Sequence, residues 1–464
     1  MTALSDYRNL SLWWDTLPDD MQGPIRDPLP GPASVDVAIV GAGYTGLWTA
    51  YYLAKSDPSL HIVILESETA GFGASGRNGG WASALFPTSL ATVAHASSRQ
   101  GAIDLQRAMF DTVDEIGRVT RDEGINCHFR KGGTIVLART PVQLARARAE
   151  IDDHRSWGFG PEDAELLGAD EARDRLGATD VLGATFTPHC AAIHPARLVR
   201  GLARVVEDLG VAIHERTRVT SIEPGIVRTV RGDVRAGKII RATEAWSSRL
   251  PGSQRDIAPV YSLMLATEPL PESFWDTVGL RRGETFSDHR HLIIYGQRTI
   301  DDHLAFGGRG APYHLGSRIK PEYDREPAVY NGLSDVLREL FPAVADHAIT
   351  HRWGGPLGVP RDWYPSVGLD PSSGIGWAGG YVGDGVASSN LAGRTLADLV
   401  RGVPSSLTEL PWVNRRSPRW EPEPLRWLGV NIGLRVMGSA DGAEQRTGKA
   451  ARRAKILAPF LGGH

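Results

Sequence analysis

The sequence contains little cysteine and lysine, and it has no long apolar run. Its two cysteines, Cys127 and Cys190, can form neither a disulfide framework nor a CxxC metal site. No stretch approaches the roughly 20 consecutive apolar residues of a membrane span. The stretch from Met1 to Asp20 lacks the basic start and the apolar core of a signal peptide. We therefore expect a cytoplasmic protein without a membrane span.

Neither sign of charge predominates. The net charge is −3, and charged residues make up 23% of the chain. A nucleic-acid-binding protein would be strongly basic, so this class is excluded. Hydrophobic residues make up 41% of the 464 residues, which is enough to fill a sizeable interior. A chain of this length is expected to form two domains, or one domain with a large insertion.

What the sequence does contain is an α/β pattern that begins near residue 34. Val35 to Val40 is a short apolar run of strand type, Tyr44 to Lys55 has helical character, and His61 to Leu65 is a second apolar strand. A strand, a helix and a strand in this order predict a parallel βαβ unit in a Rossmann-type α/β domain.

The same α/β pattern of apolar strands and helices recurs twice further along the chain. We predict a discontinuous dinucleotide-binding domain made of residues 34–95, 190–250 and 352–403. A second domain with a mixed β-sheet, which binds the substrate, is predicted for residues 96–189 and 251–351.

The two ends of the chain lie outside these domains. Residues 1–33 form an arm in which Trp13 and Trp14 are expected to pack on the body, because an exposed pair of Trp side chains is costly. Residues 404–464 form a C-terminal extension with an expected helix at Leu425 to Val436 and a basic end. Such an end can bind a membrane surface or a partner, or it can be a solvated tail docked on the body.

The first motif with chemical meaning is the turn from Gly41 to Gly46, with the pattern GxGxxG. Gly41 permits the tight turn out of the strand, Gly43 lets the backbone approach a pyrophosphate, and Gly46 lets the helix pack close to the sheet. Glu66 stands 20 residues past Gly46, at the end of the second strand, where a carboxylate can accept hydrogen bonds from a ribose diol. Together these features predict a dinucleotide site.

The motif alone does not separate FAD from NAD. A second glycine-rich loop, Gly71 to Gly80, follows Glu66 closely, where NAD-binding domains usually continue into further βα units. A flat isoalloxazine ring needs a bed lined by backbone, and glycines provide one. The loop therefore favours a flavoprotein, although an NAD-binding protein stays the alternative that the absorbance of the purified protein would decide.

Four segments in order resemble a known family. They are the GxGxxG turn, the loop GASGRNGG at residues 73–80, the strand end KIIRATEAW at residues 238–246, and the turn GYVGDGV at residues 380–386. Over about residues 34 to 401 the chain resembles the D-amino-acid-oxidase-like FAD-dependent oxidoreductases, which include sarcosine and glycine oxidases. The loop most resembles that of the gamma-glutamylputrescine oxidoreductase branch.

The resemblance implies non-covalently bound FAD, because Cys127 and Cys190 fall outside the matching segments and the usual tethering Cys or His is missing. It also implies a role for the helix that follows Val386, whose N-terminus would face the flavin pyrimidine ring, where charge accumulates on reduction. The implied cofactor-binding residues are Gly41, Gly43, Tyr44, Thr45, Gly46, Glu66, Ser67, Gly73, Ala74, Ser75, Arg77, Asn78, Gly79, Gly80, Val219, Ala242, Thr243, Trp246, Gly380, Tyr381, Val382, Gly383, Asp384, Gly385 and Val386. For Trp246, plain core packing is an equal alternative.

Two departures from the family bear on the substrate. Leu357 stands where the amino-acid-oxidising members have an Arg that clamps the substrate carboxylate, so an α-amino acid is disfavoured unless Arg309 or Arg352 reaches in. Leu304 to Gly307 lacks the Lys with which sarcosine oxidases activate oxygen, so slow reaction with oxygen is expected.

The remaining candidates are weaker. The candidate catalytic residues are Arg77, Asn78, Trp81, Tyr261, Tyr295, Arg309, Arg352 and Leu357, and each aromatic one, Trp363 included, could equally be packing. His289, Arg290, His291 and His303 are close in sequence, but strand spacing would scatter them, so no metal site is expected.

These observations predict an amine oxidation. Hydride would pass from the carbon beside a neutral amine nitrogen to the flavin, and the imine would hydrolyse. The partners are a small amine, such as a polyamine conjugate, and oxygen or another electron acceptor. The alternatives are an N-methyl or other amino acid, an aminophosphonate, or a flavoprotein with no redox role.

Overall fold

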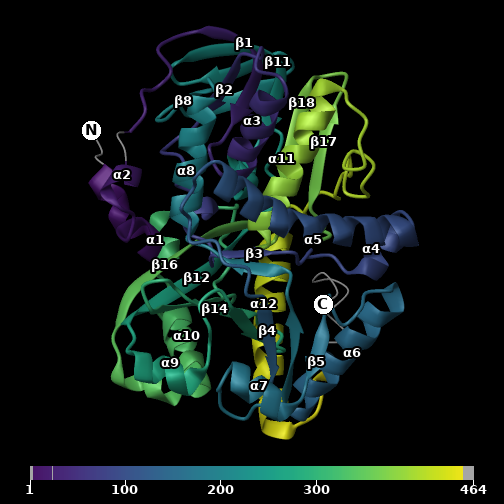
Figure 1. Cartoon of the computed structure of the whole chain (residues 1–464). Helices are drawn as coiled ribbons and strands as arrows, with labels where there is room; N and C mark the ends of the chain where they lie inside the picture. The colour runs from purple at the N-terminus through teal and green to yellow at the C-terminus, as the bar shows by residue number, and fades with distance from the viewer. Residues whose placement is uncertain (1–3, 23–24, 453–464) are drawn as a thin grey trace.

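The computed structural model describes residues 4–22 and 25–452. The described residues form two eight-stranded sheets and one two-stranded sheet, with the first large sheet at the top of Figure 1 and the second below it. The two-stranded sheet pairs β3 (Trp81–Ser83) with β7 (Cys190–Ala192). In Figure 1 it lies between the two large sheets.

The first sheet has the order β17-β18-β11-β1-β2-β8, and a hairpin of β9 and β10 continues from β11. Neighbouring strands from β18 to β8 run parallel, with α3 as the helical crossover from β1 to β2, and β17 is an antiparallel edge strand. The strands are β1 (Ala33–Val40), β2 (Ile62–Leu65), β8 (Ala212–His214), β9 (Val219–Glu223), β10 (Ile226–Thr229), β11 (Gly232–Arg241), β17 (Ser366–Asp370) and β18 (Ile375–Gly379). This is the predicted Rossmann-type sheet.

Four helices cover one side of this sheet with a common apolar core. They are α3 (Tyr44–Ser56), α5 (Arg99–Asp122), α8 (Pro195–Asp208) and α11 (Gly385–Arg401), with α4 (Leu90–Ala96) beside α5. Helices α3 and α11 lie side by side in Figure 1, although more than 300 residues separate them in sequence. The pairing brings the first glycine-rich turn and the last one to the same edge of the sheet.

The second sheet has the order β16-β12-β15-β14-β13-β4-β6-β5 and is mixed, as predicted. Its strands are β4 (Thr134–Ala138), β5 (Glu165–Leu167), β6 (Gly183–Thr187), β12 (Ala258–Pro269), β13 (Thr285–Asp288), β14 (Ile294–Arg298), β15 (His303–Gly308) and β16 (Ile349–Val359). Around it lie α6 (Pro141–Trp157), α7 (Ala169–Arg175), α9 (Glu272–Val278) and α10 (Pro327–Leu340). Short 3-10 helices complete the fold: η2 (Ala74–Gly76), η3 (Glu244–Arg249), η4 (Pro321–Arg325) and η5 (Pro342–Asp346).

Two predicted domain limits need correction. A boundary at residue 352 would cut β16, whose residues Ile349 to Val359 pair with β12 in the second sheet. The cofactor domain therefore resumes after Val359. Helix α5, which was assigned to the substrate domain, contributes buried side chains such as Met109 and Ile116 to the core beneath the first sheet. Sequence alone missed this because an amphipathic helix does not reveal which sheet it covers.

The N-terminal arm packs on the body, as expected. It consists of η1 (Leu4–Leu10), α1 (Leu12–Asp15) and α2 (Asp19–Gln22). Trp13 and Trp14 are each 2% exposed, and the Trp13 indole N–H donates a hydrogen bond of 2.8 Å to the carbonyl of Asn78. The arm therefore contacts the second glycine-rich loop and supports it.

The C-terminal extension also docks, through α12 (Leu425–Thr447), which is longer than the predicted helix. The side-chain amide of Asn431 exchanges hydrogen bonds with the backbone of Tyr313, and the Asp441 carboxylate accepts the N–H groups of His291 and Leu292. These contacts fasten α12 along the second sheet's domain. None of the described helices has the length and the apolar composition to span a membrane. Of the predicted basic end, Arg446, Lys449 and Arg452 are described, and the part beyond Arg452 lies outside the described residues.

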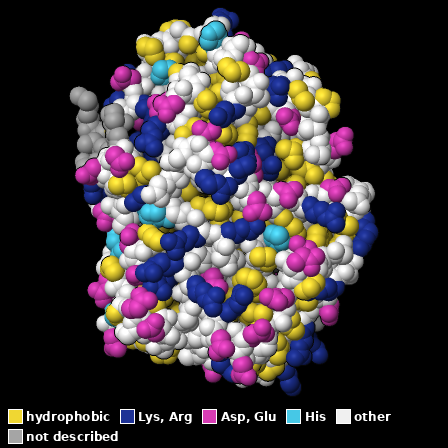
Figure 2. Space-filling view, viewed as in Figure 1, with side chains coloured by type: hydrophobic (Ala, Val, Ile, Leu, Met, Phe, Trp, Pro, Cys, Tyr) yellow, Lys and Arg dark blue, Asp and Glu magenta, His cyan; other side chains and the backbone are white. Residues whose placement is uncertain are grey.

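The face of the molecule in Figure 2 mixes basic and acidic side chains, and it shows no continuous basic stripe. This mixture agrees with the small net charge of −3.

Candidate active site

The first glycine-rich turn connects β1 to α3, and its glycines lie very close to neighbouring backbone atoms. Gly41 has a φ of +107°, and a Cβ there would lie 2.6 Å from the carbonyl oxygen of Ala242. A Cβ on Gly46 would lie 2.0 Å from the carbonyl oxygen of Gly41. Both positions therefore exclude any side chain. A Cβ on Gly43 would meet only the Ser75 hydroxyl, at 3.0 Å, so this glycine keeps space open rather than holding the fold together.

Glu66 is placed at the end of β2 by two backbone contacts. Its carboxylate accepts the N–H groups of Ala42 (2.8 Å) and Glu68 (2.9 Å). Burial raises the pKa of Glu66 to about 7. Hydrogen-bond donors of a ligand would stabilise the ionised carboxylate and would therefore bind well there. Thr217 donates its N–H to the Glu66 carbonyl at 2.7 Å, which brings the start of β9, and with it Val219, to the same edge of the sheet.

The second glycine-rich loop lies directly against the first. The Ser75 hydroxyl accepts the N–H of Tyr44 at 2.9 Å, at the first turn of α3. Asn78 holds the loop in shape, because its amide donates to the carbonyls of Ala74 and Ser75 and accepts the N–H of Gly80. The side chain of Asn78 thus shapes the loop and has no amide group left over for a substrate, which argues against a catalytic role. Ser67, on the strand side, is exposed.

Arg77 is also committed to structure. Its guanidinium donates to the carbonyls of Phe72 (2.9 Å) and Gly354 (3.2 Å) and pairs with the Asp324 carboxylate at 2.9 Å. Arg77 is buried, and burial raises the pKa of Asp324 to about 6 in spite of the pairing. These bonds tie the second loop to β16 and to η4, so a catalytic role for Arg77 is not retained.

The end of β11 contributes a residue that sequence reasoning passed over. Glu244, between Thr243 and Trp246, has a φ of +43°, and its carboxylate accepts the N–H groups of Gly358 (2.6 Å), Gly380 (3.1 Å) and Tyr381 (3.2 Å). One carboxylate therefore joins β11, β16 and the last glycine-rich turn. Its place inside the segment KIIRATEAW was the available signal, but the partners were not readable from sequence.

The last glycine-rich turn leads from β18 into α11. The Tyr381 hydroxyl lies 3.0 Å from the hydroxyl of Thr45, which fixes this turn against the start of α3. Gly383 has a φ of +112°, and α11 begins at Gly385 without a side-chain cap. The N-terminal N–H groups of α11 thus lack a side-chain acceptor, as a helix end that faces a polar ligand requires.

Several ionisable side chains near these segments lie deep in the protein and are still partly accessible. Glu66, Glu244, Tyr295, Arg309 and Asp384 lie so deep that burial dominates the pKa shift of each. Each nevertheless keeps part of its surface open. Side chains that lie deep and yet keep accessible surface are typical of the wall of an internal opening, and we infer such an opening, called the hollow below, between the glycine-rich turns. The inferred hollow would reach from Glu66, beside the first turn, to Asp384, beside the last one, which suits an extended dinucleotide.

The wall that belongs to the second sheet carries aromatic side chains. The Tyr295 hydroxyl lies 2.8 Å from the Ser262 hydroxyl, and its ring meets the Trp81 ring edge-on at 6.0 Å. A Cβ on Gly79 would lie 2.7 Å from the Tyr295 ring, so the second glycine-rich loop passes directly over this tyrosine. Trp81 and Tyr295 thus reach the site from two different sheets.

Arg309 and Leu357 meet at the same glycine of the last turn. From the Cβ position of Gly383, the Arg309 Nη2 lies 3.5 Å away and the Leu357 Cδ1 lies 3.6 Å away. Arg309 donates to the Val382 carbonyl at 2.6 Å, and its guanidinium lies 5.5 Å from the centre of the Trp363 ring. The guanidinium of Arg309, the residue that follows β15, therefore lies next to Leu357, where the resemblance would place a clamping Arg.

Two other candidates lie elsewhere. Arg352 is exposed and stands five residues before Leu357 on β16. Tyr261 packs edge-on against His314 and Tyr323, and its hydroxyl accepts the N–H of Lys320, so it belongs to the core of the second sheet. Tyr261 follows the opposite face from its neighbour Ser262, which touches Tyr295. Neither residue joins the hollow's wall at Gly383.

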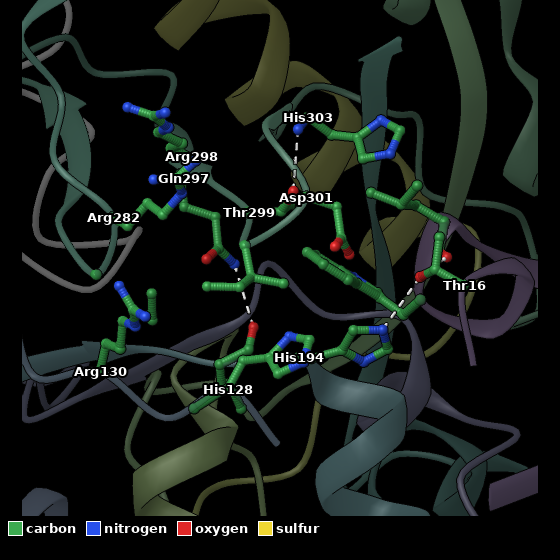
Figure 3. Close-up of a pocket in the computed structure, with 16 residues that line it drawn as sticks. Thr16, His128, Arg130, His194, Arg282, Gln297, Arg298, Thr299, Asp301 and His303 are labelled. Carbon is green, nitrogen blue, oxygen red and sulfur yellow. Dashed lines mark hydrogen bonds between the residues drawn. The ribbon is translucent and has the colours of Figure 1, made fainter. Parts of the chain in front are cut away.

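A separate small cavity beneath the N-terminal arm is shown in Figure 3. Its volume of about 20 Å³ has room for about one water molecule. His194 Nδ1 accepts the N–H of Arg197, so its Nε2 carries the proton and donates to the Thr16 hydroxyl at 3.1 Å. Gln297 donates to the carbonyl of Gly79 at 2.8 Å. These groups support the second glycine-rich loop and leave no space for a substrate.

The histidines that are close in sequence do not converge. Arg290 pairs with Asp288, and His303 bonds to the carbonyl of Thr267. His291 does meet two carboxylates of α12, Asp441 and Glu444, with ligand atoms within 4.8 Å of one another. The Arg146 guanidinium occupies this group, however, because it lies 2.7 Å from His291 and 2.5 Å from Glu444. The cluster thus fastens α12, and its guanidinium would repel a cation.

Comparison with known proteins agrees with this geometry. Residues 36–399 match a family of FAD dependent oxidoreductases. The chain is 30% identical over 382 residues to gamma-glutamylputrescine oxidoreductase of Escherichia coli, covering 81% of this chain and 86% of that protein. It is 29% identical over 402 residues to the probable oxidoreductase OrdL of Haemophilus influenzae, covering 84% and 88%.

A solved structure gives the same answer for the fold. Glycine oxidase from Geobacillus kaustophilus superimposes with a TM-score of 0.69 at 22% identity, over 83% of this chain and all of that one. The glycine-rich turns, Glu66 and the deep hollow fit an FAD molecule. The family match spans most of the chain, and its relatives act on amines and amino acids. The chain belongs to the FAD-dependent oxidoreductase family of D-amino-acid-oxidase-like enzymes.

Proposed function

We propose that this enzyme oxidises the C–N bond of a primary or secondary amine that carries no α-carboxylate. FAD supplies the hydride acceptor, and the imine product hydrolyses to an aldehyde or ketone. The observation that carries the proposal is the position of Leu357, beside Gly383 in the turn before α11. A carboxylate held against Leu357 would lose its water and gain no partner there, which costs several kcal/mol.

The proposed cofactor-binding residues form two groups, one at each end of the hollow. Glu66 and Val219 would hold the adenosine, and the turn from Gly41 to Gly46 with Ser75 would hold the pyrophosphate. The strand end from Ala242 to Trp246 would lie along the dinucleotide. The turn of residues 380–386 would meet the flavin pyrimidine ring, with Trp81 and Tyr295 towards the substrate.

We expect FAD to be bound non-covalently. Cys127 and Cys190 are at most 1% exposed, and Cys190 contacts the hydroxyl of Thr285 inside the second domain. Acid precipitation should therefore release all of the flavin into the supernatant. Flavin that stays with the precipitated protein would contradict this expectation.

The aromatic wall supports a neutral amine. Trp81 and Tyr295 pack edge-on and would present ring surface to the substrate, and an apolar pocket lowers the pKa of a bound amine. Only the neutral amine has the nitrogen electron pair that assists loss of hydride from the adjacent carbon. The similarity to E. coli gamma-glutamylputrescine oxidoreductase supports a polyamine conjugate as the first substrate to try.

One observation favours a second candidate, an N-methyl or other amino acid. Arg309 reaches the same glycine as Leu357, and its single hydrogen bond, to Val382, leaves other N–H groups open. A carboxylate could bind there rather than at residue 357. The same guanidinium also suits an anion further along an amine's chain, so Arg309 is compatible with both candidates.

An anaerobic screen tests the proposal. Purified holoenzyme is mixed with polyamines, their acyl conjugates, glycine, sarcosine and D-amino acids, and loss of the oxidised flavin absorbance is followed. We expect the polyamine group to bleach the flavin fastest. Faster bleaching by glycine, sarcosine or D-amino acids would contradict the proposal and would favour the second candidate, oxidation of an N-methyl or other amino acid.

A further inference from the structure

Asp384 is a deep-lying but partly accessible residue, and no described residue donates a hydrogen bond to its carboxylate. It stands directly before α11, its side chain caps no N–H group of that helix, and its own N–H donates to the Tyr381 carbonyl at 2.9 Å. The carboxylate keeps part of its surface open to the hollow, although the residue lies deep in the protein. Buried carboxylates are almost always partnered, so an open one inside a binding cavity indicates a missing ligand.

The surroundings of Asp384 define what this ligand would be. Arg309 is the cation that acts on Asp384, and it lies beyond ion-pair distance, engaged with the Val382 carbonyl. Cys190 on β7 is fully buried against the Thr285 hydroxyl, and burial raises the pKa of its thiol, which therefore stays neutral. Tyr295 faces Arg309, and burial raises the pKa of its hydroxyl, which also stays neutral. An acceptor without a close donor thus lies in the part of the hollow next to Leu357.

We propose that Asp384 forms the ammonium subsite of the substrate pocket and takes the proton that an amine must lose before it is oxidised. This inference rests on the proposed amine oxidation, but it does not depend on whether the amine has an α-carboxylate. The turn would then divide its roles between backbone and side chain: the backbone of residues 380–386 would face the cofactor, and the Asp384 carboxylate, which caps no N–H group of α11, would face the substrate.

The proton transfer is balanced within the site. The substrate ammonium binds to the Asp384 carboxylate, one N–H bond breaks, and one O–H bond forms on the carboxylate. The electron pair of the broken bond stays on nitrogen, so the amine becomes neutral and Asp384 becomes a carboxylic acid. Burial raises the pKa of Asp384 to about 7, while desolvation lowers the pKa of the amine, so both shifts bring the two groups closer in proton affinity.

The test separates binding from turnover by using a cation that cannot be oxidised. A butyltrimethylammonium salt has no N–H proton and no free electron pair, so holoenzyme can only bind it. Its dissociation constant is measured by isothermal titration at several pH values, for the wild type and for Asp384→Asn. Asp335→Asn, an exposed position on α10, is the matched control.

We expect wild-type binding to strengthen as the pH rises through about 7, because Asp384 becomes charged, and binding by Asp384→Asn to be independent of pH in this range. At pH 8 the Asn variant should bind the cation about tenfold more weakly or worse, as expected for loss of a charged partner. Asp335→Asn should behave as the wild type. Equal affinity of Asp384→Asn and wild type at pH 8, with the flavin content unchanged, would overturn the proposal.

Turnover gives a second, independent readout. In Asp384→Asn the rate constant for anaerobic flavin reduction by a primary amine should fall at neutral pH and recover as the pH rises, because solvent then supplies the neutral amine. Asp384→Glu should restore part of the rate. A pH profile of Asp384→Asn that is parallel to the wild type would also contradict the role of Asp384. If no amine reduces the wild-type flavin while cation binding still depends on Asp384, the proposed function fails and the cation subsite stands.

Discussion

The two ends of the hollow are built in different ways. At the nucleotide end the wall is backbone: a Cβ on Gly46 would lie 2.0 Å from a carbonyl oxygen, and Glu66 bonds to two main-chain N–H groups. At the substrate end the wall is made of side chains from β3, β14 and β16 and from the residue that follows β15, namely Trp81, Tyr295, Leu357 and Arg309. The cofactor end therefore tolerates almost no change in shape, whereas the substrate end can change chemistry on an unchanged fold.

The largest effect is expected at the nucleotide end. Gly46→Val would force a side chain into the Gly41 carbonyl, so α3 could not pack on β1, and we expect no soluble folded protein. Gly43→Leu is the matched comparison, because a Cβ there meets only the movable Ser75 hydroxyl. Circular dichroism and flavin absorbance should show this variant folded but free of FAD.

If Gly43→Leu retains stoichiometric FAD, the pyrophosphate does not approach the backbone at Gly43. If Gly46→Val folds normally, the close contact between α3 and β1 is not as tight as described, and the contrast between the two ends of the hollow weakens.

A smaller effect is expected from Glu66→Ala, which removes the proposed ribose acceptor. The variant should keep the fold and bind FAD about 10 to 100-fold more weakly, because hydrogen bonds to a charged group contribute about 1.5–3 kcal/mol. Titration of the apoprotein with FAD, followed by flavin fluorescence, measures this. Retention of the wild-type dissociation constant would remove Glu66 from the ribose site.

Much of the nucleotide end could be predicted from the sequence because its signals are local. A tight turn, a close approach and a carboxylate at a strand end each leave a residue type at a fixed spacing, as Gly41, Gly46 and Glu66 do. The sheet and its helices followed from apolar periodicity, and the packing of Trp13 and Trp14 followed from the cost of exposing two Trp side chains.

The substrate end was not readable to the same degree because its contacts join distant strands. Arg77 and Tyr261 were candidates by residue type, but one is tied to Asp324 and the other lies on the far face of its strand. Glu244 was overlooked because its partners, Gly358 and Gly380, are more than 100 residues away. The boundary at residue 352 failed for the same reason, since the pairing of β16 with β12 is a long-range contact.

At the substrate end, Leu357→Arg should change specificity without changing the fold. The guanidinium would extend beside Gly383, where the leucine is now in ordinary van der Waals contact. We expect the preference for an α-carboxylated substrate over the plain amine to rise about 10 to 100-fold, the contribution of a charge-assisted hydrogen bond. Anaerobic reduction rates with both substrates measure the shift, and Leu357→Met is the neutral control. An unchanged preference would mean that residue 357 does not face the substrate.

The smallest effect concerns the electron acceptor. β15 carries no lysine, and Leu304, Ala305 and Phe306 are fully buried. We expect reduced enzyme to react slowly with oxygen and faster with an artificial acceptor dye, as stopped-flow reoxidation would record. Reoxidation by oxygen as fast as reduction by the amine would show that the missing lysine does not limit this enzyme.

The most direct test of the central claim is one ratio of rate constants in the wild-type holoenzyme. Anaerobic flavin reduction is measured by stopped flow with a simple amine and with its α-carboxylated analogue at the same concentration and pH. Leu357 beside the last glycine-rich turn predicts that the simple amine reduces the flavin faster. Faster reduction by the α-carboxylated analogue would contradict the account and would assign the carboxylate to Arg309 and the enzyme to amino-acid oxidation.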